Sequence, residues 1–230
     1  MSRKNSLFLL LFILVSVLAA AAAVHRSAPA FSGAKQFAVV LDAGHGAPDG
    51  GAVGATGIDE KDINLDIVQK LREILLSRGV RVILTRDGDN GIYDSSAKTI
   101  REKKLSDMQS RRDMINGSGA DLVVSVHINS FTGSSARGLH VFYDKAHPEA
   151  ETTASAIQDS IAALTDAKTH AVKPAADNLY LMQGSAVPMI LVECGFLSNP
   201  EEEQLLLSEQ YRAKIAFAIA NAISKQDTIK

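Results

Sequence analysis

Cysteine and surplus basic charge are both scarce in this chain. With Cys194 as its one cysteine, the chain cannot form an intramolecular disulfide bond, so its fold does not rely on one. The formal net charge is −2, and without the first 24 residues, which hold Arg3, Lys4 and no acid, 22 basic residues face 26 acidic ones. No lysine- and arginine-rich stripe is interleaved with aromatic residues. These absences argue against a nucleic-acid partner.

What is present is typical of one globular domain behind a targeting segment. Arg3 and Lys4 precede the apolar stretch 7–24, which is rich in small residues at its end. This order is typical of a signal peptide, and the stretch is also just long enough for a membrane anchor, so residues 1–24 predict one or the other. A buried core helix fits poorly because no charged residue interrupts the stretch. Either way the rest of the chain would be exported, with this segment as its one membrane contact.

Residues 25–36 are predicted to be a linker, and residues 37–225 a single domain in which apolar strands alternate with amphipathic helices. This alternation predicts an α/β fold with a twisted, mostly parallel sheet flanked by helices. Predicted strands are 37–41, 80–85, 122–127, 138–143, 179–182 and 189–193. Predicted helices are 59–77 (capped by Asp59), 106–117 (opened by a capping box at Ser106), 148–164 and 200–224 (with a break near Ser208), and 87–104 is predicted to be a long loop.

Four titratable residues stand out in short apolar contexts. His45, His127 and Glu193 each lie at or just beyond the end of a predicted strand, and Glu60 begins the first predicted helix. A polar residue that ends a buried strand is costly to desolvate without a partner. In parallel sheets, functional side chains collect at the carboxyl ends of strands. Two imidazoles and two carboxylates together suit a hydrolytic zinc site, in which three residues bind the metal and the fourth moves protons.

Each of these residues also has a simpler interpretation. His45 between two glycines can be a turn residue, Glu60 can serve the helix dipole, and His127 can be a satisfied core histidine. Glu193 has the weakest alternative, because a lone carboxylate in an apolar strand is costly or protonated. A thiol nucleophile at Cys194 is a further alternative, although a lone buried cysteine usually packs in the core.

Neighbouring residues suggest supporting roles. Asp42, three residues before His45, is positioned to accept a hydrogen bond from its other ring nitrogen and fix the tautomer. Asn129 points the same way as His127 along an extended chain and is predicted to orient a ligand or substrate carbonyl. His170 lies in a polar segment and is a candidate substrate contact.

Five segments in this order resemble those of the zinc-dependent N-acetylmuramoyl-L-alanine amidases of the "amidase 3" family. The resemblance covers about residues 37–225 and departs at Ala43 and Ala47, where proline and a third glycine are common. The segments are Leu-Asp-Ala-Gly-His-Gly at 41–46 with Asp-Gly-Gly-Ala at 49–52, Glu-Lys-Asp-Ile-Asn-Leu at 60–65, Thr-Arg at 85–86, Ser-Val-His-Ile-Asn-Ser at 125–130 and Val-Glu-Cys-Gly-Phe-Leu-Ser-Asn at 192–199.

The resemblance implies a six-stranded sheet and hydrolysis of the amide that joins N-acetylmuramic acid to L-alanine in peptidoglycan. It implies one zinc ion bound by His45, Glu60 and His127, with Glu193 as the catalytic acid and base. Within the matching segments Asn64 and Arg86 join Asn129 and His170 as expected substrate contacts.

Among these amidases, the chain looks closest to those of the spore cortex in endospore formers. It has one N-terminal hydrophobic segment, an extended 87–104 loop and no added wall-binding repeats. Only 65 residues separate His127 from Glu193, which leaves no obvious room for the autoinhibitory helix of several division amidases. The expected role is removal of stem peptides so that muramic-δ-lactam can form, outside the cytoplasm and with an activating protein partner also considered.

Three other functions fit parts of this pattern. A vegetative amidase of division or lysis would use the same residues on a different wall. A zinc peptidase cutting within the stem peptide would use the same metal chemistry, and released D-alanine would reveal it. A wall-binding protein without activity is the non-enzymatic alternative, but it would be expected to have lost a ligand or Glu193, and all four residues are present.

Overall fold

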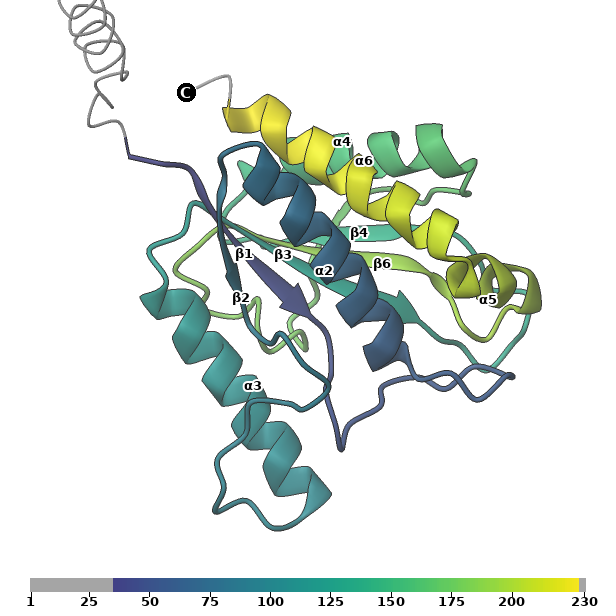
Figure 1. Ribbon diagram of the computed structural model, residues 1–230, viewed down its shortest axis with the longest axis horizontal. Coiled ribbons are helices and arrows are strands. Elements are labelled where there is room, and N and C mark those ends of the chain that lie inside the picture. Colours follow the sequence, from purple (N-terminus) through teal and green to yellow (C-terminus); the bar gives the residue numbers. More distant parts are fainter. Residues whose placement is uncertain (1–34, 228–230) are drawn as a thin grey trace, which may run out of the picture. The chain divides into compact units, whose positions relative to one another are not determined.

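A computed structural model describes residues 35–227, which form a six-stranded sheet with helices on both faces (Figure 1). The predicted targeting segment and almost all of the predicted linker lie outside these residues. The strands are β1 (Ala38–Ala43), β2 (Arg81–Leu84), β3 (Leu122–Asn129), β4 (His140–Tyr143), β5 (Lys173–Pro174) and β6 (Met189–Phe196). The helices are α2 (Glu60–Ser77), α3 (Ile100–Gly117), α4 (Ala150–Thr165), α5 (Pro200–Leu207) and α6 (Glu209–Asp227).

The strand order is β2-β1-β3-β6-β4-β5, and the four strands from β2 to β6 run parallel. Strand β4 is antiparallel to β6 and parallel to the two-residue β5. The predicted mostly parallel, six-stranded sheet is therefore confirmed. Within the described residues no helix is both long and apolar enough to cross a membrane.

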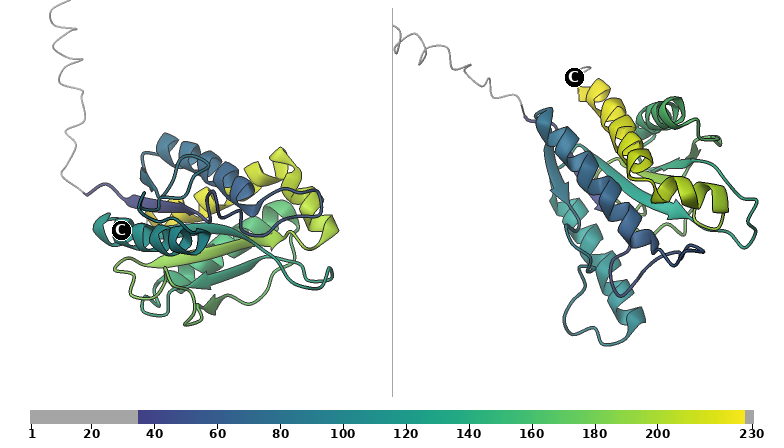
Figure 2. Two further views of the ribbon diagram at one scale, coloured as in Figure 1. Left: turned by 90° about the horizontal axis from the view of Figure 1, so that it is seen from below. Right: turned by 45° about the vertical axis from the view of Figure 1, so that its right-hand side comes forward.

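Alternating side chains on the central strands build two different layers. In β3, Val124 and Val126 join the larger core, which is completed by α2, α4 and α6, whereas Val123 faces the opposite side. Figure 2 shows α2 and α6 lying side by side over the sheet, with α3 on the other face. On that second face α3 and the segment around Leu181 pack against the sheet. Because strand side chains alternate, His127 and Glu193 also belong to this second face.

The structure corrects several local predictions. Helix α3 begins at Ile100 and not near Ser106, because Thr99 and Glu102 form the capping box, and the loop therefore ends at Thr99. The Ser106 hydroxyl instead accepts a hydrogen bond from the backbone of Asp94.

Two further predictions also fail. Asp59 stands at the N-cap of α2 without making a capping hydrogen bond. Residues 179–182 form turns and not a strand, and the sixth strand is β5, which is too short to show a sequence pattern. The expected break near Ser208 is confirmed, since it separates α5 from α6.

A buried ion pair attaches α3 to the sheet. The Arg111 guanidinium is 1% exposed, lies 2.6 Å from Asp42 and 2.7 Å from Asp107, and donates to the backbone of Ala43 and His45. Burial opposes the charge on Asp42, but Arg111 and its other partners outweigh this and lower its pKa to about 2. The ionised Asp42 therefore adds to the free energy of unfolding at pH values above the ordinary pKa of an aspartate, and this contribution is lost as the pH falls toward 2.

Replacing Arg111 with methionine should lower the free energy of unfolding by about 3–5 kcal/mol, because Asp42 would remain buried without its cation. Urea unfolding measures the change. The double variant Asp42→Asn with Arg111→Met is the matched control, and it should recover part of the loss because Asp42 no longer carries an unpaired charge, while Asp107 still lacks its partner. Equal destabilisation by the single and double variants would mean that the ion pair does not carry the effect.

Candidate metal centre and active site

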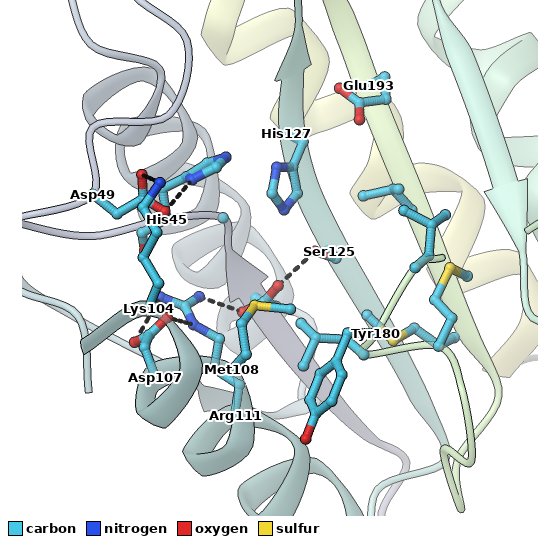
Figure 3. A pocket seen from close by; sticks show the side chains of 17 residues that line it. His45, Asp49, Lys104, Asp107, Met108, Arg111, Ser125, His127, Tyr180 and Glu193 are labelled. Carbon is cyan, nitrogen blue, oxygen red and sulfur yellow. Dashed lines mark hydrogen bonds and ion pairs between the residues drawn. The ribbon is translucent and has the colours of Figure 1, made fainter. Parts of the chain in front are cut away.

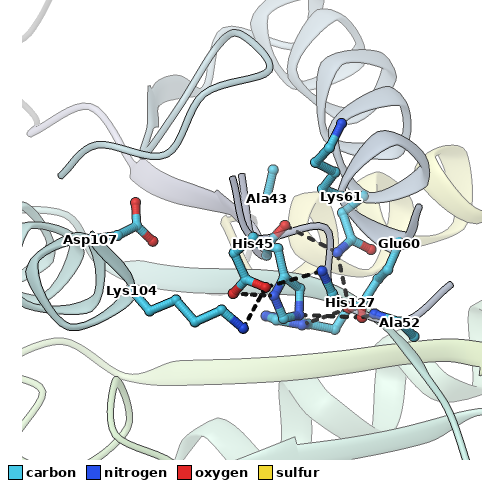
Figure 4. A network of polar contacts seen from close by, with 12 residues as sticks. Ala43, His45, Ala52, Glu60, Lys61, Lys104, Asp107 and His127 are labelled. Atoms are coloured by element: carbon cyan, nitrogen blue, oxygen red, sulfur yellow. Dashed lines mark hydrogen bonds and ion pairs between the residues drawn. The ribbon is translucent and has the colours of Figure 1, made fainter. Parts of the chain in front are cut away.

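Three side chains from three elements meet at the carboxyl edge of the sheet (Figure 4). His45 follows β1, Glu60 is the first residue of α2, and His127 lies in β3. The Nε2 atom of His45 lies 3.2 Å from one Glu60 oxygen, and Nδ1 of His127 lies 3.0 Å from the other. One potential ligand atom from each residue lies within 4.8 Å of the others, which is close enough for all three to bind one metal ion.

Glycines allow this close approach. A side chain at Gly44 would lie 2.2 Å from the His127 ring, and one at Gly51 would lie 2.6 Å from a Glu60 oxygen. His45 itself adopts a left-handed backbone conformation, with φ of 63°, that few residues other than glycine adopt. The glycines therefore leave the space that the ligand side chains need to pack together, in addition to allowing unusual backbone conformations.

Glu60 is fixed by more than the two imidazoles. Its oxygens accept hydrogen bonds from the backbone of Ala52 at 2.9 Å and Ile128 at 3.1 Å, and its side chain is almost fully buried. Burial opposes its negative charge, but His127 and His45 outweigh this and hold the pKa of Glu60 well below its usual range. The cluster is thus built around an ionised carboxylate.

Asp49 orients His45. Its carboxylate lies 3.0 Å from Nδ1 of His45 and forms an ion pair with Lys104 of α3 at 2.7 Å. It also accepts a hydrogen bond from the backbone of Gly51. Burial opposes protonation of His45, but Asp49 and Glu60 together raise the pKa of that ring to about 9. The prediction that Asp42 is this partner is wrong. The Asp42 oxygens instead accept hydrogen bonds from Arg111 and from the hydroxyls of Thr85 and Ser125.

Glu193 faces the cluster from the neighbouring strand, where it is paired in register with His127. Its Oε2 atom is buried and has no hydrogen-bond partner among the described residues. Burial raises the pKa of Glu193, and nearby Glu60 adds to the rise while His127 acts against it. An unpartnered buried carboxylate oxygen beside three metal-type ligands fits a site that receives a cation and a reacting group.

A cavity of about 290 Å³ lies beside the cluster. His45, His127 and Glu193 line its upper part in the view of Figure 3. Two nitrogen donors and one carboxylate form an open ligand set, which is the composition of hydrolytic zinc sites. The second ring nitrogen of His45 bound to a carboxylate is also typical of metal-ligating histidines. The donor set therefore fits zinc.

Comparison with known proteins agrees with this geometry. Residues 39–225 match the family described as N-acetylmuramoyl-L-alanine amidase (Amidase_3). The chain belongs to this amidase family. It is therefore an enzyme that hydrolyses the amide between N-acetylmuramic acid and L-alanine in peptidoglycan.

Three relatives illustrate the similarity. The germination-specific N-acetylmuramoyl-L-alanine amidase of Bacillus subtilis is 36% identical over 84% of this chain and 80% of that protein. The CwlD amidase of Clostridioides difficile, solved in complex with the GerS lipoprotein, is 39% identical, with a TM-score of 0.81 over 85% of this chain and 100% of that chain. E. coli AmiA is 30% identical over 84% of this chain and 76% of its own length.

The four expected substrate contacts of this amidase do not line the cavity. Asn64 donates to Glu60 and to the Gly44 carbonyl, and Arg86 donates to backbone carbonyls that include those of residues 43 and 44. Both are buried, so they support the cluster from behind.

The remaining two candidates lie in other surroundings. Asn129 accepts a hydrogen bond from the backbone of Ser130, and the His170 ring lies against His140 with centroids 4.0 Å apart and planes tilted by 41°. Cys194 points into the larger core, and burial raises the pKa of its thiol far above the usual range, which argues against a thiol nucleophile.

Asp49 is the functional residue that sequence reasoning missed. Its place four residues after His45, inside a matching family segment, was the available signal. Arg111 gave no signal, because an arginine in a polar helix is usually exposed.

Replacing Asp49 with alanine should weaken zinc binding about 10- to 100-fold, since the ring of His45 would lose the carboxylate that orients it. Competition with a chromophoric chelator measures the affinity. Lys104→Met is the matched control: it removes the lysine partner of Asp49, leaves the contact with His45 and should change zinc affinity much less. Unchanged affinity in Asp49→Ala would contradict this role.

Proposed function

We propose that this amidase is an exported zinc enzyme that removes stem peptides from spore-cortex peptidoglycan, so that muramic-δ-lactam can form. In this proposal His45, Glu60 and His127 hold the zinc ion, and Glu193 is the catalytic acid and base. The observation that carries the proposal is the unpartnered Glu193 oxygen beside the three clustered ligands.

Zinc, when bound, supplies Lewis-acid activation of water and of the scissile carbonyl. The protein residues account for the remaining requirements. Asp49 and the backbone hydrogen bonds to Glu60 hold the ligand side chains in place, so little reorganisation is needed when substrate binds.

Glu193 moves the proton. As a carboxylate it accepts one proton from the attacking water, and as the resulting acid it gives that proton to the departing alanine nitrogen. The water oxygen joins the lactyl carbonyl carbon and the carbon–nitrogen bond breaks. The new carboxyl group then gives up the second proton of the water to the amine, so the products are a lactyl carboxylate and an ammonium group. Burial of Glu193, which raises its pKa, suits a residue that must hold the proton between these two steps.

Substitutions should separate the two roles. Glu193→Gln should retain one zinc per chain while activity on purified peptidoglycan falls about 10²- to 10⁴-fold, which is the usual effect of losing a general acid and base. His127→Ala should lose stoichiometric zinc together with activity. Metal analysis and mass spectrometry of the digested wall, with and without chelator, measure both.

These measurements also discriminate between the alternatives. Free muramoyl lactyl groups identify the amidase reaction, whereas released D-alanine would identify a peptidase. Loss of zinc in Glu193→Gln would identify Glu193 as a metal ligand. Full zinc content in His127→Ala would contradict the assignment of the metal site.

The cortex role rests on several similarities. One relative is named as germination-specific. Between β3 and β6 the described chain forms β4, α4 and β5, and α4 packs on α6 and the larger core, so this helix does not cover the site. The predicted targeting segment, 1–24, would carry the enzyme out of the cytoplasm. A protein partner is part of the proposal, because the similar CwlD amidase was solved in complex with a lipoprotein.

Expression in a Bacillus subtilis strain that lacks its germination-specific amidase should restore muramic-δ-lactam to the spore cortex. Digestion of the cortex followed by mass spectrometry measures the lactam. The Glu193→Gln variant, expressed to the same level, is the control and should restore none. An active enzyme that reaches the cortex but restores no lactam would favour the vegetative role.

A further inference from the structure

The cavity beside the metal-ligand cluster has two chemically different ends. His45, His127 and Glu193 form one end, and the other is apolar (Figure 3). Three separate segments contribute its apolar wall. These are α3 with Met108, the turns with Leu179, Leu181 and Met182, and β6 with Met189 and Leu191.

Outside this cluster, the charged side chains that line the cavity already have partners. Lys104 lies 2.7 Å from Asp49, and Arg111 pairs with Asp42 and Asp107. A ligand carboxylate or ammonium group entering the apolar end would therefore be desolvated without a free opposite charge, which is costly. The apolar end is suited to an uncharged aliphatic group.

Strand geometry links this end to one side of the scissile bond. Glu193 and Leu191 lie on the same face of β6, two residues and thus about 6–7 Å apart. In the proposed mechanism, on which this inference rests, Glu193 gives its proton to the departing nitrogen. The side chain of the departing amino acid is two bonds from that nitrogen, which brings the apolar wall at Leu191 within its reach.

The wall is fixed in place. The Arg112 guanidinium carbon of α3 lies 3.5 Å from the centre of the Tyr180 ring, and the same group donates to the backbone carbonyl of Tyr180. These contacts hold the turns against α3. Leu181 and Met182 are buried although they border the cavity. The apolar end is therefore a formed pocket and not a gap beneath a loose loop.

We propose that this pocket binds the side chain of the amino acid on the amine side of the bond and accepts aliphatic side chains larger than the methyl group of L-alanine. Six side chains from three segments form the apolar wall, and a methyl group contacts only part of such a wall, so a larger aliphatic side chain has further apolar surface to pack against. The enzyme therefore also hydrolyses muramoyl amides of valine and leucine. Each reaction consumes one water and yields a lactyl carboxylate and the released amino acid or peptide with a protonated amino terminus.

Synthetic N-acetylmuramoyl dipeptides with glycine, alanine, valine, leucine or aspartate at the first position test this. The readout is kcat/KM of the zinc-loaded enzyme. The glycine substrate should be cleaved about 10-fold or more slowly than alanine, since one methyl group in an apolar pocket changes kcat/KM about 10- to 200-fold. The kcat/KM values for valine and leucine should stay within about 10-fold of the value for alanine. The value for aspartate should be at least about 100-fold lower than that for alanine, which exceeds the roughly 10-fold minimum effect of a single methylene group.

Two variants that fill the pocket from different elements add a second test. Leu191→Phe and Met108→Trp should lower kcat/KM for the leucine substrate about 10-fold more than for alanine, the smallest effect expected of one methylene. Leu164→Phe, on the exposed side of α4, is the matched control and should alter neither substrate. Zinc content and melting temperature identify any variant that misfolds. The five substrates measured with the unmodified enzyme test the proposal even if both variants misfold.

The outcomes are distinct. Valine and leucine substrates cleaved at less than a hundredth of the alanine rate would overturn the proposal, and so would an aspartate substrate as good as alanine. Equal losses for alanine and leucine in both folded, zinc-loaded variants would also overturn it. Failure to cleave the alanine substrate itself would refute the proposed function instead.

Discussion

The Glu60 carboxylate is the contact on which the rest of the site depends. One oxygen faces His45 and accepts a hydrogen bond from the backbone N–H of Ala52. The other faces His127 and accepts a hydrogen bond from the backbone N–H of Ile128. A single side chain thereby joins the loop after β1, the start of α2 and the end of β3. Because Glu60 is buried and ionised, this arrangement requires positive partners, which the two imidazoles or a metal ion supply.

The two faces of the sheet divide the work of the protein. One face packs against α2, α4 and α6 and gives a continuous apolar core, in which Cys194 is one more packed side chain. The other face carries Asp42, His127 and Glu193, which line the same cavity as Met108 of α3. Since neighbouring residues on a strand point to opposite faces, Glu193 and Cys194 differ completely in role although they are adjacent.

Helix α3 connects stability with the site. Arg111 binds Asp42 beneath the sheet edge and the carbonyl of His45 at the edge itself, and Lys104 holds the carboxylate that orients His45. Arg112 fixes the turns that close the apolar end of the cavity. One face of a single helix thus contacts the histidine segment and the pocket wall, which explains why a polar helix packs on this side.

The sequence alone determined the strand–helix alternation, the parallel sheet and the grouping of His45, Glu60, His127 and Glu193, because hydrophobic periodicity and the matching segments are local signals. It could not determine which carboxylate contacts His45: Asp42 lies three residues before it and Asp49 four residues after it, and only the packing of Arg111 against Asp42 decides. It also could not show that residues 179–182 are turns, since a short apolar run fits a strand equally well. Those outcomes depend on contacts with α3, far away along the chain, and only the tertiary structure brings them together.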